Sequence, residues 1–109
     1  MNVHYSSAFK TTIKAEGITQ AEVIEAMHVI EEDAAGRPHP LYLNKDCEAI
    51  RDTGLIWYRL KPKHAQYRIV YSVQRAEKTI TVEGIFRRNA RTYTRIMHLF
   101  KATPERNQP

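Results

Sequence analysis

Near its start the chain carries apolar residues at the spacing of a helix. Phe9 and Ile13 lie four residues apart and so share one helical face. Ser6 or Ser7 can cap this helix, and Gly17 marks its end. The pattern predicts a short amphipathic helix.

A second, longer helix is predicted to begin after Thr19, which has capping-box spacing with Glu22. Gly36 and Pro38 end it. One face repeats apolar residues, and we expect the acidic outer face to contact solvent. The apolar residues are Val23, Ile24, Met27, Ile30 and Ala34, and the acidic residues are Glu22, Glu25, Glu32 and Asp33.

From Leu55 onward the chain changes to three runs rich in β-branched and aromatic residues. The connections at 62–66 and 75–78 are short enough for hairpins, which predicts an antiparallel meander. Turn-forming residues predict a loop over 36–54, with a short extended piece at Leu41–Leu43. The three runs are Leu55–Lys61, Tyr67–Gln74 and Thr79–Phe86, and Val3–Tyr5 can add a short N-terminal strand.

Alternation along the three strands separates two faces of the predicted sheet. One face is apolar and would lie under the two N-terminal helices, and the other would stay open and collect cations. The apolar face would hold Ile56, Tyr58, Leu60, Ile69, Tyr71, Val73, Ile80, Val82 and Phe86. The open face would hold Trp57, Arg59, Lys61, Arg68, Glu83 and Arg87.

Helical spacing returns at Tyr93, Ile96, Met97 and Phe100, which predicts a C-terminal helix. The pattern as a whole predicts an α+β fold. In it, two N-terminal helices pack on one face of a small antiparallel sheet made of the meander and the possible first strand. Because 109 residues can build one modest core, we expect a single domain over 1–103 and a flexible tail over 104–109.

The charge of the chain narrows the range of partners that it can be expected to bind. The chain has 17 Lys and Arg against 12 Asp and Glu, a net charge of +5. Such a surplus can serve solubility alone, but here the cations are concentrated in the second half. A basic, aromatic-bearing sheet face favours a polyanionic partner such as RNA.

Other features indicate where the protein works. Cys47 is the single cysteine, so an internal disulfide is excluded and an inert thiol in a reducing compartment is expected. No secretory signal or membrane-spanning run is visible, which predicts a cytoplasmic protein without membrane contact. The histidines have no metal-ligand spacing, so we expect neither a metal nor a cofactor.

The segment YRLKPKHAQYRIVYSV at 58–73 resembles the hairpin of the RelE/ParE toxin superfamily. It is supported by IFRRNARTY at 85–93, which is similar to the family's last strand and the tyrosine beyond it. The resemblance covers about residues 3–100 and implies a RelE-like fold. It is closer to the mRNA interferase branch, whose members cleave mRNA in the ribosomal A site without a metal, using the RNA 2′-hydroxyl as nucleophile. It also implies a cognate antitoxin partner.

The resemblance implies a set of site residues. Arg59 and Lys61 fall at basic positions of the first hairpin strand, Lys63 falls in its turn, and Arg68 is the arginine of the Tyr-Arg pair. Arg87 falls at the end of the last strand, with Arg88 as the alternative if the register slips by one. The predicted catalytic residues are Arg68, Arg87, Tyr93, Lys61 and His64, and the predicted RNA-binding residues are Arg59, Lys61, Lys63, Arg88 and Arg91.

These residue types suit the reaction. Attack by a 2′-oxygen on the adjacent phosphate needs a base, cations for the transition state and a proton for the leaving oxygen. Arginine provides a planar, permanent charge for the phosphate. Tyr93 can act as the base if nearby cations lower its pKa, His64 needs less tuning, and Glu83 is a carboxylate alternative.

Each residue also has a structural interpretation. Arg68 can serve the fold, Tyr93 can pack in the core beside Ile96, and Trp57 can pack rather than stack on a base. Basic residues can simply protect an exposed sheet from aggregation. The alternatives to a nuclease are a ParE-like gyrase inhibitor and a non-catalytic relative that binds RNA or protein. The density of cations favours the nuclease.

Overall fold

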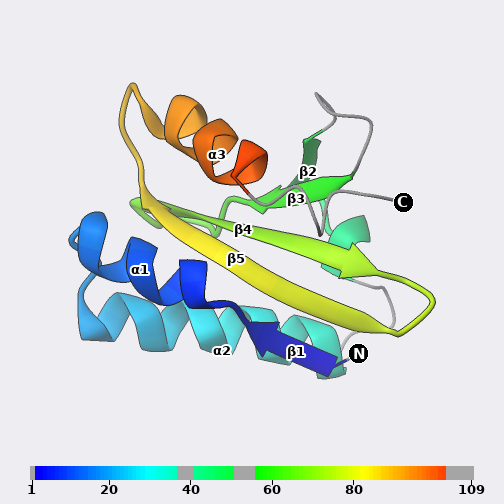
Figure 1. Cartoon of the computed structure of the whole chain (residues 1–109). Helices are drawn as coiled ribbons and strands as arrows, with labels where there is room; N and C mark the ends of the chain where they lie inside the picture. The colour runs from blue at the N-terminus through cyan, green and yellow to red at the C-terminus, as the bar shows by residue number, and fades with distance from the viewer. Residues whose placement is uncertain (1, 37–40, 51–55, 103–109) are drawn as a thin grey trace.

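A computed structural model describes residues 2–36, 41–50 and 56–102 of the chain. Two helices, α1 (Ser7–Ala15) and α2 (Gln20–Gly36), lie on one face of a five-stranded sheet, and α3 (Thr92–Lys101) lies on the other (Figure 1). The strands are β1 (Asn2–Tyr5), β2 (Cys47–Ile50), β3 (Trp57–Leu60), β4 (Tyr67–Gln74) and β5 (Thr79–Arg87), and η1 (Leu41–Leu43) is a single 3₁₀ turn. The predicted α+β class is confirmed.

The sheet has the order β1-β5-β4-β3-β2. The predicted meander β3-β4-β5 is confirmed and antiparallel, and the possible first strand is confirmed as β1. The sheet is mixed rather than antiparallel throughout, because β1 runs parallel to β5. Helices α1 and α2 follow β1, and the chain pairs with β1 only through its last strand, β5. A long connection of this kind allows neighbouring strands to run parallel, whereas a hairpin would make them antiparallel.

The loop predicted over 36–54 is wrong in part. Residues 47–50 form β2, which pairs antiparallel with β3, and Leu41–Leu43 form the turn η1 instead of an extended piece. A four-residue strand flanked by turn-forming residues has too short a pattern to detect, and its pairing partner, β3, comes later in the chain. Pro38, Leu55 and the predicted tail lie outside the described residues.

Both N-terminal helices begin where their caps predict. The Ser6 hydroxyl accepts from the Phe9 amide at 3.2 Å. The Thr19 amide donates to the Glu22 carboxylate at 3.0 Å, and the Glu22 amide donates to the Thr19 hydroxyl at 3.2 Å, which completes the capping box. Gly17, between the helices, has a φ of +64°, which a residue with a side chain rarely adopts.

The core has two layers, one on each side of the sheet. The larger layer joins the sheet to α1 and α2 through residues such as Phe9 and Ile30. The smaller layer lies under α3, where the Trp57 and Phe100 ring centroids are 4.4 Å apart. The face predicted to remain open is therefore partly covered, and Trp57, 1% exposed, is a packing residue.

An irregularity in β5 reverses the faces of its last residues. Val70 of β4 pairs with Gly84 and Tyr71 pairs with Val82, so Glu83 is an extra residue on β5. Beyond this point Ile85 returns to the α1–α2 layer, and Phe86 joins the α3 layer. The predicted placement of Phe86 with Ile80 and Val82 is wrong for this reason, and Ile56, also predicted on that face, is exposed.

The acidic face of α2 is only partly solvated. Asp33, predicted to contact solvent, is 6% exposed and accepts a hydrogen bond from the Asn44 amide at 3.2 Å. Glu22 is engaged by Arg87 and Glu25 by the Tyr67 hydroxyl. No described helix is long and apolar enough to span a membrane.

Candidate nucleic-acid interface

A basic pocket lies where β4 begins and β5 ends, beside the first turn of α3. It has a volume of about 270 Å³ and is open to solvent. Its cations come from β3, from the residue that follows β3, from β4 and from the β5–α3 connection. The lining residues are Arg59, Lys61, Arg68, Arg88, Asn89, Ala90, Thr92 and Tyr93.

The positive charges of the pocket act on one another. Partial burial lowers the pKa of Arg68, and the charges of Arg88 and Arg59 lower it further. The Arg68 guanidinium donates to the backbone carbonyl of Tyr67 at 3.0 Å. An arginine remains charged under such a shift, so the pocket concentrates positive charge where an anion can enter.

Tyr93 lies at the rim of this pocket and not in the core. Its side chain is 47% exposed, whereas Ile96 and Phe100 on the same helix are fully buried. The Arg59 guanidinium carbon lies 5.9 Å from the centre of the Tyr93 ring, within the range of a cation–π contact. The core-packing interpretation of Tyr93 is therefore wrong, and its ring adjoins the cations.

Arg87 does not join the basic pocket. In the register it lies opposite Tyr67, on the face covered by α1 and α2. Its guanidinium donates to both Glu22 oxygens, at 2.6 and 2.8 Å, and to the Gly17 carbonyl at 2.7 Å. Arg88, the alternative at a register slip of one, lines the pocket instead.

The β5–α3 connection that carries Arg88 is held in place by Arg95. This arginine binds the Glu16 carboxylate through Nε and Nη2, at 2.7 Å in both cases. It also donates to the Asn89 side chain at 2.9 Å and to the Arg87 carbonyl at 3.0 Å. Arg95 and Glu16 could not be predicted from the sequence, because they lie 79 positions apart and no local pattern marks them. Arg91 is exposed and precedes α3 without lining the pocket.

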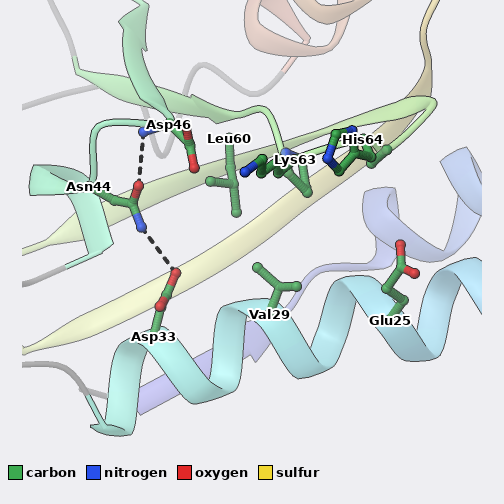
Figure 2. A pocket seen from close by; sticks show the side chains of 10 residues that line it. Glu25, Val29, Asp33, Asn44, Asp46, Leu60, Lys63 and His64 are labelled. Atoms are coloured by element: carbon green, nitrogen blue, oxygen red, sulfur yellow. Dashed lines mark hydrogen bonds between the residues drawn. The ribbon is translucent and has the colours of Figure 1, made fainter.

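Lys63 and His64 lie elsewhere. They line a second pocket of about 350 Å³, which opens on the α2 side of the sheet (Figure 2). Its walls carry three acidic residues, Glu25, Asp33 and Asp46. In the β3–β4 turn His64 has a φ of +65°, and its side chain lines this pocket. The sequence predicted that both residues lie beside the cations of the hairpin. In the structure they line a different pocket from Tyr93.

Neither Glu83 nor Cys47 lines either of these two pockets. Glu83 is fully buried and accepts a hydrogen bond from the Ser72 hydroxyl at 3.1 Å. Cys47 is half-buried, its thiol donates to the Leu41 carbonyl, and burial raises its pKa to about 11. A thiol with this pKa stays protonated at neutral pH and is a poor nucleophile. Among the described residues, no group of three or more His, Cys, Asp or Glu is arranged to hold a metal ion.

The fold and the pocket together define an α+β protein with a cationic site at one end of its sheet. The chain resembles a chain of the archaeal RelE–RelB complex from Pyrococcus horikoshii, with a TM-score of 0.53, 20% identity, and coverage of 82% of this chain and 96% of that one. This likeness shows that the chain has the RelE-like fold that the sequence resemblance implied.

A second solved structure, the isolated E. coli RelE toxin, matches with a TM-score of 0.43 and 14% identity over 91% of this chain and 97% of that one. No protein-family model matches the sequence, and no curated protein sequence matches it.

Proposed function

We propose that this chain is the toxin of a type II toxin–antitoxin pair, and that it is a metal-independent endoribonuclease which cleaves mRNA in the ribosomal A site. One observation supports this most: on a RelE-like fold, four cations and a tyrosine line a single open pocket. A gyrase inhibitor would need no such convergence. The archaeal neighbour is a RelE–RelB complex, and we expect this chain to bind a cognate antitoxin in the cytoplasm.

In the proposed reaction the RNA 2′-oxygen attacks the adjacent phosphorus, and the bond to the 5′-oxygen breaks. Tyr93, in the phenolate form that neighbouring cations favour, takes the proton of the 2′-hydroxyl, because its ring lies at the rim of the pocket beside Arg59. Arg68 and Arg88 hold the phosphate oxygens and stabilise the charge that develops on them. Lys61 is the cation that can donate a proton to the leaving 5′-oxygen.

The remaining basic residues have supporting parts in this proposal. Arg59 lies under the Tyr93 ring and contributes charge to the RNA backbone, and Arg91 extends the basic surface beyond the pocket. We assign no step to Lys63, His64 or Arg87, because these side chains face the other side of the sheet.

Tyr93→Phe tests the proposal, since it keeps the ring and removes only the hydroxyl. We expect the variant to fold normally, bind ribosomes through unchanged cations, and cleave mRNA about 10²- to 10⁴-fold more slowly. Single-turnover cleavage on programmed ribosomes measures this, with His64→Gln as the matched control that should keep full activity. Full activity of Tyr93→Phe with loss in His64→Gln would transfer the proton step to His64, and no cleavage by the wild type would refute the nuclease.

A further inference from the structure

Two of the four cations that line the basic pocket are already bound by a carboxylate of the same chain. Glu48 lies on the edge strand β2, directly opposite Arg59 of β3. One oxygen, Glu48 Oε2, lies 2.5 Å from Arg59 Nη2 and 3.0 Å from Lys61 Nζ. These contacts lower the pKa of Glu48, so the carboxylate stays charged at neutral pH.

Among the described residues, the other two cations have no comparable counter-ion. Arg68 donates to the Tyr67 carbonyl, and Arg88 forms no ion pair with any residue that the structure describes. The pocket therefore has two halves. In one half, no described carboxylate balances the positive charge, and in the other a carboxylate already occupies the position where an anion would bind.

We propose that Glu48 is a built-in counter-ion that takes the place of a phosphate and makes the pocket specific for adjacent phosphates of one strand. This inference rests on the proposed function, because it takes the pocket to bind RNA. A first phosphate binds Arg68 and Arg88. The next phosphate along the strand displaces Glu48 from Arg59 and Lys61. A single phosphate finds only the Arg68–Arg88 half available.

Displacement of Glu48 requires that its own contacts be weak enough to exchange. The side chains of Glu48 and Lys61 are 54% and 44% exposed, whereas that of Arg59 is 20% exposed. Water competes for the Glu48–Lys61 pair, and an ion pair between such exposed groups contributes little net free energy. At Arg59 an incoming phosphate replaces one anion by another, so the guanidinium keeps an anionic partner. A phosphodiester backbone can therefore replace this carboxylate, and the freed Glu48 can turn to solvent from the sheet edge.

Glu48→Gln tests the inference in the intact chain, because it removes the charge and keeps the size of the side chain. The probe is a fluorescent single-stranded RNA with 2′-O-methyl riboses, which cannot be cleaved through its 2′-oxygen. We expect Glu48→Gln to bind this probe about three- to tenfold more tightly than the wild type at fixed salt, because RNA no longer has to displace a carboxylate from Arg59 and Lys61. The control is Glu77→Gln, in the exposed turn at the other end of β4 and β5, and its affinity should stay within about twofold.

The same substitution in a second variant distinguishes direct displacement of Glu48 from general electrostatic repulsion of the RNA. In Arg59→Ala/Lys61→Ala, the further change Glu48→Gln should bring no gain, since the cations that Glu48 occupies are gone. A gain that persists there, or an equal gain in Glu77→Gln, would overturn the inference while leaving RNA binding intact. Unchanged affinity of Glu48→Gln would overturn it too. If neither the wild type nor Glu48→Gln binds the probe, the proposed function fails and the inference fails with it.

Discussion

At the scale of single residues, neighbouring arginines have opposite surroundings. Arg87 binds a carboxylate and a backbone carbonyl at the α1–α2 junction, and its side chain is 30% exposed. Arg88, the next residue, is exposed and lines the basic pocket. Equal charge and adjacent positions therefore do not predict equal roles, because a strand places successive side chains on opposite faces.

These two arginines allow a matched comparison. We expect Arg88→Ala to slow RNA cleavage about 10²- to 10³-fold with little change in stability, as is typical when one contact to transition-state charge is lost. Arg87→Ala should instead destabilise the protein by about 1–2 kcal/mol, because a two-pronged arginine–carboxylate contact is lost. Urea unfolding and single-turnover cleavage measure both. The reverse result would place Arg87 at the site, as the family resemblance implied.

At the scale of elements, the contact between β5 and α3 depends on a residue without a side chain. A Cβ atom on Gly84 would lie 2.7 Å from a ring carbon of Phe86 and 2.9 Å from a methyl carbon of Leu99. Such distances require the neighbours to move, and Phe86 is buried between the sheet and α3. Because α3 carries Tyr93, the seating of this helix also sets the pocket.

We therefore expect Gly84→Ala to lower the free energy of unfolding by about 1–3 kcal/mol, the range found for overpacked cores. Urea denaturation followed by circular dichroism measures this change. Ala76→Gly, in the exposed β4–β5 turn, exchanges the same two residue types in reverse and controls for backbone effects alone. A wild-type midpoint for Gly84→Ala would mean that α3 tolerates a shift away from β5.

The junction of α1, α2 and β5 should respond to acid. Hydrogen bonds from Arg87, and then from the Thr19 backbone, lower the pKa of Glu22 from its ordinary 4.5 to about 2. A carboxyl with a lowered folded-state pKa contributes stability that is present above about pH 4.5 and is lost as pH falls towards 2.

Glu22→Gln should remove this dependence. Between pH 5 and pH 2 we expect the wild-type melting temperature to fall further than that of Glu22→Gln, by about 4 °C if the contact contributes about 1 kcal/mol. Thermal unfolding at pH 5, 3 and 2 measures the difference, with Glu32→Gln on the outer face of α2 as the control. Parallel losses in all three proteins would show that the Arg87–Glu22 contact does not stabilise the fold.

At the scale of the whole molecule, charge is divided between the two faces of the sheet. The α3 side carries the basic pocket, and the α2 side carries a pocket walled by Glu25, Asp33 and Asp46. A net charge of +5 favours polyanions in general, and in the proposed function this division would direct the RNA to the α3 side.

Production of the chain alone should stop growth by stopping translation. In pulse-labelled cells we expect incorporation of amino acids to fall before incorporation of thymidine, because mRNA is the proposed target. The matched strain produces Arg88→Ala at the same level and should continue to grow. Loss of thymidine incorporation first would support the gyrase inhibitor instead.

The sequence by itself determined the features that depend on neighbours in the chain. The cap at Ser6, the capping box of Thr19, the meander and the last helix follow from local periodicity and from hydrogen bonds within a few residues. The family resemblance added the hairpin cations, and the pocket brings Arg59, Lys61, Arg68 and Tyr93 together.

Only the tertiary structure decided the features that depend on distant partners. Strand β2 exists because β3 supplies its hydrogen bonds, and the extra residue at Glu83 exists only relative to β4. That extra residue exchanges the faces of Arg87 and Arg88, since a shift of one position in a strand turns every later side chain over. Local periodicity does not indicate which strand a residue pairs with. The lining of the pocket therefore follows only from the three-dimensional structure.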